Sequence, residues 1–195
     1  MEIEKFIKIY DGEIDIKQIA SLIKYANNKV KFEDAGIILE NNNNKTDKGV
    51  RKNIRNTKVH SFTNADKNNL SSAHWGHYIR HIIRNKFFNK YDNEYPTTAT
   101  SIKSVDLLKY EVGGFYKQHI DNHGKFPRTV SVIIFLNNDY EGGELNFHNP
   151  LTNEIYQTIK PAPGRCVMWP SNFMYPHSIS PVTKGTRYSV VSWIA

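Results

Sequence analysis

The stretch T-V-S-V-I-I-F-L-N at residues 129–137 decides the fold class of this chain. β-branched and aromatic side chains dominate it, and the turn residues Asn137-Asn138-Asp139 close it, so it predicts a buried β-strand. Similar runs in the second half of the chain predict seven more strands, near residues 102–110, 117–121, 143–148, 154–160, 165–169, 173–180 and 186–194. Eight short strands in one stretch predict a mainly β fold with flanking α, whose core is a double-stranded β-helix, or jelly roll.

Two helices are predicted before these strands. Asp15, followed three residues later by Gln18, resembles a capping box and begins a helix over 16–27, and apolar residues at helical spacing predict a second helix over 71–88. We expect one domain, 1–195, in which an N-terminal helical part, 1–100, packs on one sheet of the jelly-roll core, 101–195. The Asn-rich basic stretch 41–53 has neither the period of 2 typical of a strand nor the period of 3.6 typical of a helix, so we expect an exposed, mobile loop there.

The composition is that of a soluble globular protein. With 39% hydrophobic and 23% charged residues, and no apolar run near the roughly 18 residues of a membrane span, the chain is not expected to enter a membrane. Residues 1–10 show no apolar core of a secretory signal, which favours a cytoplasmic location. The single cysteine, Cys166, cannot form an internal disulfide, and we expect it buried in a strand.

The net charge of +7 favours an acidic partner, without deciding between nucleic acid, protein and small anion. Much of the excess lies in residues 45–58, where six Lys or Arg residues accompany Asp47. Such a run is either a solvated loop or a surface that attracts an acidic ligand.

One set of side chains indicates a metal site. His119 and Asp121 are two apart on a predicted strand, so both leave the same face, and His177 belongs to a strand that a jelly roll places next to the first. Two imidazoles and one carboxylate leave open positions on one side of an ion, which is the arrangement of non-haem Fe(II) oxygenases. His74, His77 and His81 share a helix, but their outer members lie about 10 Å apart along its axis, so they are not expected to share an ion.

Arg187 lies at the start of the last predicted strand, ten residues after His177. Its planar guanidinium pairs with a carboxylate through two hydrogen bonds, which suits a fixed anchor for the distal carboxylate of 2-oxoglutarate. Ser189 faces the same way and can donate a further hydrogen bond to that carboxylate.

The segment H-I-D-N-H-G-K-F-P-R-T-V-S-V-I-I-F-L-N from His119, with G-G-E-L-N-F from Gly142, P-G-R from Pro163 and R-Y-S-V-V-S-W from Arg187, resembles the prolyl 4-hydroxylase-like Fe(II)/2-oxoglutarate-dependent dioxygenases. The resemblance spans roughly residues 50–193 and looks closest to the hypoxia-type prolyl hydroxylases. It implies an oxidoreductase that uses iron, O₂ and 2-oxoglutarate, with ascorbate as an accompanying reductant. It also implies 2-oxoglutarate binding by Arg187 and Tyr110, with Ser189 beside them, and decarboxylation to succinate coupled to C–H hydroxylation.

The implied substrate is a prolyl residue in a protein or peptide. The charge of the basic stretch in turn favours acidic segments near the target residue. The residues expected to contact it are Arg55, Tyr116, Arg128 and Trp193. His123 and His148 are expected in supporting or surface positions.

Two other functions stay open. A nucleic-acid demethylase would share the iron chemistry, but nucleic acid is disfavoured because no second Arg follows Arg187 in the pattern R-x-N-x-T-x-R that closes those enzymes. A cupin-like binding module without catalysis would need neither open metal positions nor a buried Arg.

Overall fold

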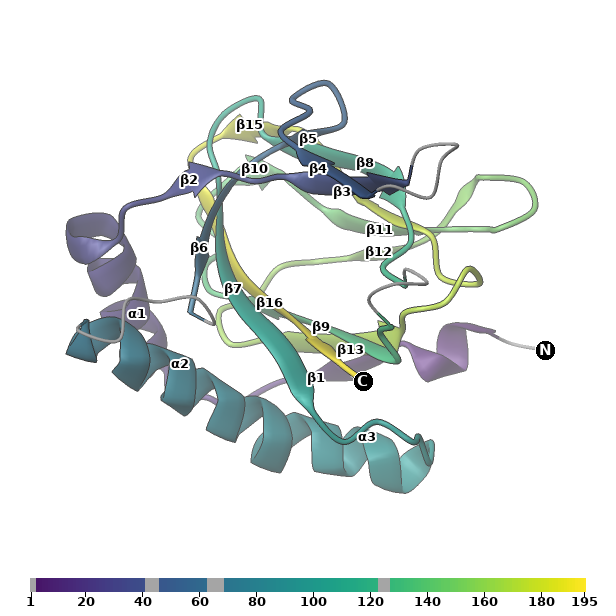
Figure 1. Cartoon of the computed structure of the whole chain (residues 1–195), viewed down its shortest axis with the longest axis horizontal. Helices are drawn as coiled ribbons and strands as arrows, with labels where there is room; N and C mark the ends of the chain where they lie inside the picture. Colours follow the sequence, from purple (N-terminus) through teal and green to yellow (C-terminus); the bar gives the residue numbers. More distant parts are fainter. Residues whose placement is uncertain (1–2, 41–45, 63–68, 123–126) are drawn as a thin grey trace.

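The computed structural model describes residues 3–40, 46–62, 69–122 and 127–195, in which two antiparallel sheets face each other and helices cover the outside of the larger one (Figure 1). The larger sheet contains, in spatial order, β1 (Lys8–Tyr10), β13 (Cys166–Pro170), β9 (Val130–Phe135), β16 (Arg187–Ile194), β7 (Ile102–Tyr110), β6 (Lys58–Ser61) and β2 (Glu33–Asp34). The smaller contains β12 (Ile155–Ile159), β11 (Leu145–His148), β14 (His177–Ile179), β8 (Phe115–His119) and β5 (Arg55–Asn56).

Two strand pairs flank the sheets: β3 (Ile37–Glu40) with β4 (Thr46–Gly49), and β10 (Glu141–Gly142) with β15 (Val182–Lys184). The helices are the 3-10 turn η1 (Ile3–Phe6), α1 (Ile16–Lys29), α2 (Leu70–Ile82), the π-helical η2 (Ile83–Phe88) and α3 (Asn89–Glu94). Asp15 caps α1 by accepting a hydrogen bond from the Lys17 amide, as its side chain predicts.

The alternation of side chains along β16 separates two cores. Tyr188, Val190 and Ile194 face the helices, in a cluster that includes Leu22 of α1 and Ile79 of α2. The opposite face of the larger sheet meets the smaller sheet in a second cluster, which includes Phe135, Phe147 and Trp169. The helices thus stabilise the larger sheet from outside and leave the space between the sheets for a site.

The jelly roll with helices on one sheet is confirmed. The strand predicted at 102–110 has those bounds, and most others differ by one to three residues. The strand predicted at 117–121 ends at His119, so Asp121 lies in the following turn. Cys166 is buried in β13, as expected.

The N-terminal part is less purely helical than expected. β1, β2 and β6 extend the larger sheet and β5 extends the smaller one. These strands have two to four residues, too few for a period-2 pattern to show. The stretch 46–49, expected to be loop, forms β4, whereas residues 41–45 lie outside the described part. Among the described residues no helix is long and apolar enough to cross a membrane.

Candidate active site

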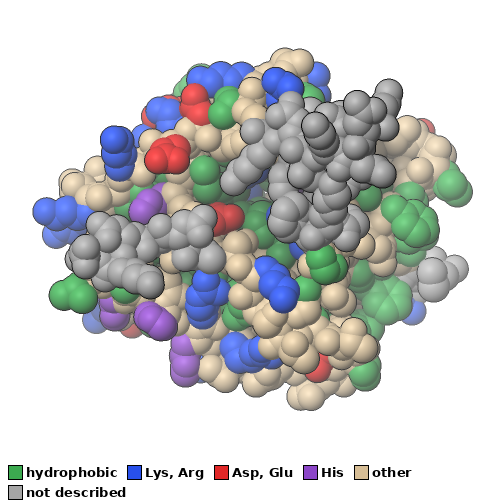
Figure 2. All heavy atoms as spheres, in the orientation of Figure 1, with side chains coloured by type: hydrophobic (Ala, Val, Ile, Leu, Met, Phe, Trp, Pro, Cys, Tyr) green, Lys and Arg blue, Asp and Glu red, His purple; other side chains and the backbone are tan. Residues whose placement is uncertain are grey.

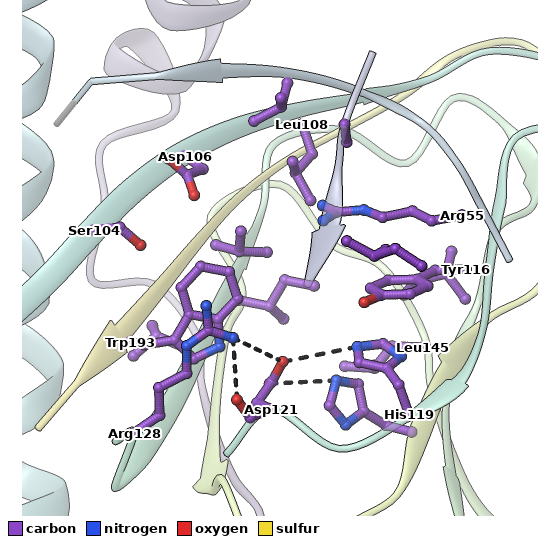
Figure 3. A pocket seen from close by; sticks show the side chains of 18 of the residues that line it. Arg55, Ser104, Asp106, Leu108, Tyr116, His119, Asp121, Arg128, Leu145 and Trp193 are labelled. Carbon is purple, nitrogen blue, oxygen red and sulfur yellow. Dashed lines mark hydrogen bonds and ion pairs between the residues drawn. The ribbon is translucent and has the colours of Figure 1, made fainter. Parts of the chain in front are cut away.

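The predicted metal ligands come together between the sheets. β8 and β14 pair antiparallel in a register that places His177 opposite His119, and the turn after β8 brings Asp121 to both (Figure 3). Asp121 Oδ1 lies 3.7 Å from His119 Nε2, and Oδ2 lies 3.4 Å from His177 Nε2. The three ligand atoms lie within 4.8 Å of one another, in the one group of this kind found among the described residues.

Backbone carbonyls orient both imidazoles. His119 Nδ1 lies 2.8 Å from the Lys117 oxygen, and His177 Nδ1 lies 3.1 Å from the Tyr175 oxygen. A carbonyl only accepts hydrogen bonds, so Nδ1 carries the proton and each Nε2 presents a lone pair. The Tyr116 ring stacks on His119, with centroids 3.6 Å apart. A proton on Nδ1 and a lone pair on Nε2 make the tautomer that a metal ligand requires.

The protonation states also suit a cation. Burial lowers the pKa of His119 to about 3, and the neighbouring His177 adds to this effect. Burial alone would raise the pKa of Asp121, but His177, His119 and Arg128 lower it to about 2. At neutral pH the site therefore presents a neutral imidazole beside a carboxylate, which are the states that bind Fe(II).

The donor set fits iron. Two imidazole nitrogens and one carboxylate oxygen converge from one side, and the cavity described below adjoins them. Sulfur ligands, which would favour zinc or an iron–sulfur cluster, are absent from this group.

Arg187 is fully buried at the start of β16, opposite Tyr110 of β7. Its Nη1 donates a 2.8 Å hydrogen bond to Ser189 Oγ, which fixes the guanidinium. Nε and Nη2, however, have no hydrogen-bond partner among the described residues. These two nitrogens form one edge of the guanidinium and match the two oxygens of a carboxylate. Buried donors without partners are costly, so this edge fits the distal carboxylate of 2-oxoglutarate.

A cavity of about 400 Å³ adjoins the histidines. It is lined by eight of the ten predicted site residues: Arg55, Tyr110, Tyr116, His119, Asp121, Arg128, His177 and Trp193. Arg187 and Ser189 are not among its lining residues, but Arg187 Cζ lies 4.9 Å from the ring centre of Tyr110, which lines the cavity.

The four residues expected to contact substrate form two stacked pairs. The guanidinium carbon of Arg128 lies 3.7 Å from the centre of the Trp193 ring, and that of Arg55 lies 4.7 Å from the Tyr116 ring (Figure 3). Stacking holds both Arg side chains in place at the cavity wall.

Sequence reasoning missed the support of Asp121. Ser131 and Ser171 form a buried chain to its carboxylate, and Arg128 Nη1 donates to its backbone oxygen at 3.1 Å. A signal existed, because Ser131 is the lone polar residue inside the apolar run V-S-V-I-I-F.

The other histidines that the structure describes lie apart from the three ligands. His148 lies 2.7 Å from Ser178 Oγ through Nε2, and His123 is outside the described residues. His74, His77 and His81 are exposed on α2, where Figure 2 shows histidine side chains gathered.

The comparisons with known proteins agree with this site. Residues 105–195 match the family model of the 2OG-Fe(II) oxygenase superfamily. A PKHD-type hydroxylase of Synechococcus sp. (strain JA-2-3B'a(2-13)) is 33% identical over 101 residues, which are 48% of this chain and 43% of the relative. Human prolyl 3-hydroxylase 2 is 36% identical over 66 residues, 34% of this chain and 9% of that protein. The chain thus spans less than half the length of these curated relatives.

Solved structures share the fold over nearly the whole chain. A Pseudomonas putida prolyl-4-hydroxylase superposes with a TM-score of 0.69 at 16% identity, covering 97% of this chain and 92% of that one. A Trichoplax adhaerens prolyl hydroxylase, in complex with a hypoxia inducible factor peptide fragment, gives 0.72 at 17% identity, covering 97% and 83%.

The fold, the metal site and the family model agree: residues 105–195 are similar to the 2OG-Fe(II) oxygenase superfamily. The relatives and the shared fold confirm the finer resemblance, which is to the prolyl hydroxylase-like members of this class.

Proposed function

We propose that this protein is a Fe(II)- and 2-oxoglutarate-dependent dioxygenase that hydroxylates a peptidyl proline at C4. One observation carries the proposal: His119, Asp121 and His177 line the same cavity as Tyr110, and Tyr110 lies next to the buried Arg187, two of whose donors make no hydrogen bond among the described residues. A metal site and a carboxylate anchor in this relation suit a 2-oxo acid that spans them.

Each group has a separate task in this proposal. His119, Asp121 and His177 would hold Fe(II), which when bound supplies O₂ activation coupled to decarboxylation of 2-oxoglutarate. Arg187 would bind the distal carboxylate, with Tyr110 and Ser189 beside it. Arg128 and Trp193 would position the substrate on one side, and Arg55 and Tyr116 would contact it on the other.

A prolyl residue suits the cavity chemically. Aliphatic side chains such as Ile133, Leu145 and Val191 line it together with Trp193, so a small apolar ring would be desolvated there. The prolyl hydroxylases among the relatives and solved structures support this substrate class.

Charge supports an acidic peptide. Arg55, Lys103 and Arg128 line the cavity, against the metal ligand Asp121 and a single other carboxylate, Asp106. Lys and Arg side chains are also spread across the face in Figure 2, consistent with the net charge of +7. We propose that acidic residues flank the target proline, because these cations would attract them. We also propose a reducing, cytoplasmic setting, which keeps iron ferrous.

The test measures succinate formed from 2-oxoglutarate with Fe(II) and ascorbate, with and without proline peptides that carry acidic, neutral or basic flanks. We expect a gain of 16 Da on proline, fastest with acidic flanks, and 4-hydroxyproline on amino-acid analysis. Arg187→Ala should remove 2-oxoglutarate-dependent turnover while the fold remains. Turnover with methylated oligonucleotides instead of peptides would favour the demethylase alternative. Metal binding without turnover of 2-oxoglutarate, with or without peptide, would favour the binding module.

A further inference from the structure

Tyr140 lies beside the proposed carboxylate anchor, in the connection between β9 and β10. Its hydroxyl is buried and, among the described residues, makes no hydrogen bond of normal geometry. Burial raises the pKa of Tyr140, and the neighbouring Arg187 guanidinium offsets part of that rise. A buried phenol hydroxyl therefore lies against the Arg187 guanidinium, and among the described residues neither it nor Arg187 Nε and Nη2 makes a hydrogen bond of normal geometry.

Two glycines bring Tyr140 close to Arg187. A Cβ added at Gly143 would lie 3.0 Å from Arg187 Cδ and 3.2 Å from Tyr140 Cε2, so both side chains press against this one backbone position. A Cβ added at Gly185 would lie 3.2 Å from Tyr140 Cα. Both glycines have positive φ, of 65° and 76°, which other residues rarely adopt. The close approach of Tyr140 and Arg187 therefore depends on glycine at positions 143 and 185.

The chemistry of a carboxylate leaves room for a third donor. Its two oxygens offer about four acceptor positions, and the Nε–Nη2 edge of Arg187 occupies two of them. The Ser189 hydroxyl already accepts from Arg187 Nη1 at 2.8 Å. The raised pKa keeps the Tyr140 hydroxyl protonated at neutral pH, so it can donate.

We propose that the Tyr140 hydroxyl donates a hydrogen bond to the distal carboxylate of 2-oxoglutarate and, with Arg187, selects 2-oxo acids that carry this group. This inference rests on the proposed function and extends it to a residue that the sequence did not single out. Tyr140 is a binding residue in this role, because it contacts the cosubstrate far from the reacting carbons.

The experiment compares two ligands by titration calorimetry in Mn(II)-loaded protein. 2-Oxopentanoate has the same carbon chain as 2-oxoglutarate but a methyl group in place of the distal carboxylate. We expect Tyr140→Phe to weaken 2-oxoglutarate binding about tenfold, since a hydrogen bond to a charged group is lost. Binding of 2-oxopentanoate should stay within twofold, which also shows that the metal site is intact.

Tyr25→Phe is the matched control. The Tyr25 hydroxyl is likewise buried and partnerless among the described residues, but it lies in α1, in the core on the outer side of the larger sheet. It should bind both ligands like the wild type. The Tyr140 assignment is overturned if the wild type prefers 2-oxoglutarate and Tyr140→Phe keeps that preference in full. A wild type without preference would instead overturn the proposed cosubstrate, and the Tyr140 contact with it.

Discussion

Ser131 Oγ donates a 2.7 Å hydrogen bond to Asp121 Oδ2, and its oxygen lies 2.7 Å from Ser171 Oγ. The Ser131 hydroxyl donates its one proton to the carboxylate, so Ser171 must be the donor in the hydrogen bond between the two serines. Ser131 lies on β9, whereas Asp121 follows β8, so this contact ties the metal ligand to the opposite sheet. The two-serine chain therefore fixes a ligand that no strand holds.

Ser131→Ala should weaken binding of Fe(II) or Mn(II) about tenfold, because a support of this kind orients the ligand carboxylate. Metal titration followed by calorimetry measures the affinity. Ser192→Ala is the control, since Ser192 is equally buried but donates to the Ser104 carbonyl. Equal metal affinity in wild type and Ser131→Ala would show that the turn alone positions Asp121.

Much of this site could be predicted from residue type and spacing. A jelly roll brings the two strands that carry His119 and His177 side by side, so the pairing of the histidines followed from the fold. Asp121 joined them for a different reason than alternation along a strand, because β8 ends at His119 and a turn directs the carboxylate. Asp121 was thus predicted correctly as part of the cluster, although the strand predicted to carry it ends two residues earlier.

The partners of these residues could not be predicted in the same way. Tyr140 approaches Arg187, and Ser171 approaches Ser131, only through contacts between segments far apart in the chain. The P-G-R motif is another case: Arg165 forms two hydrogen bonds to Asp11, at 2.9 and 2.8 Å, across 154 positions of sequence. Such pairs form only in the packed tertiary structure, and hydrophobic periodicity and composition do not reveal them.

Gly143→Ala should both lower the affinity for 2-oxoglutarate and lower the free energy of unfolding. The new methyl would lie 3.0 Å from Arg187 Cδ and from Val182 Cγ2, at a φ of 65°. We expect a loss of roughly 1–3 kcal/mol in unfolding free energy and a displaced anchor. Gly12→Ala separates the two effects, because Gly12 also has positive φ but no atom within 4 Å of an added Cβ. It should cost stability without changing cosubstrate affinity.

Cys166 should not react with thiol reagents in the folded protein at pH 8. The side chain is fully buried in β13, and burial raises the pKa of the thiol well above its usual value, so little thiolate forms. Reaction with a chromogenic disulfide should appear only on denaturation and then report unfolding. Rapid labelling of the native protein would contradict this burial.

The Asp11–Arg165 pair should make stability depend on pH in the acid range. Its hydrogen bonds from Arg165 lower the pKa of Asp11 in the folded state, so the stabilisation is present above the ordinary carboxyl pKa. It is lost as pH falls from about 4 through the lowered value. Because the Asp11 side chain is 54% exposed, we expect about 1 kcal/mol or less.

Asp11→Asn should therefore lower the melting temperature slightly at pH 7 and leave it unchanged at pH 2–3. Asp15→Asn is the control, because Asn caps a helix about as well as Asp. If the melting temperatures of wild type and Asp11→Asn differ as much at pH 2–3 as at pH 7, the charge of Asp11 is not the source of the stabilisation.

Replacing Arg187 by Met should separate stability from function. Arg187 is 0% exposed, and two of its nitrogens lack partners among the described residues, so without cosubstrate the folded state carries a buried charge that is only partly solvated. Methionine fills a similar volume without that cost. We expect Arg187→Met to be more stable than the wild type by about 1–3 kcal/mol without ligand.

Addition of 2-oxoglutarate should reverse the order. A ligand that binds only the folded state stabilises the wild type, by about 2.7 kcal/mol at a concentration of one hundred times Kd, whereas Arg187→Met should gain nothing. Thermal unfolding with and without 2-oxoglutarate and Mn(II) measures both effects. A variant less stable than the wild type when both are unliganded would mean that the guanidinium is already solvated or paired. A variant that 2-oxoglutarate still stabilises would mean that the anchor is another residue.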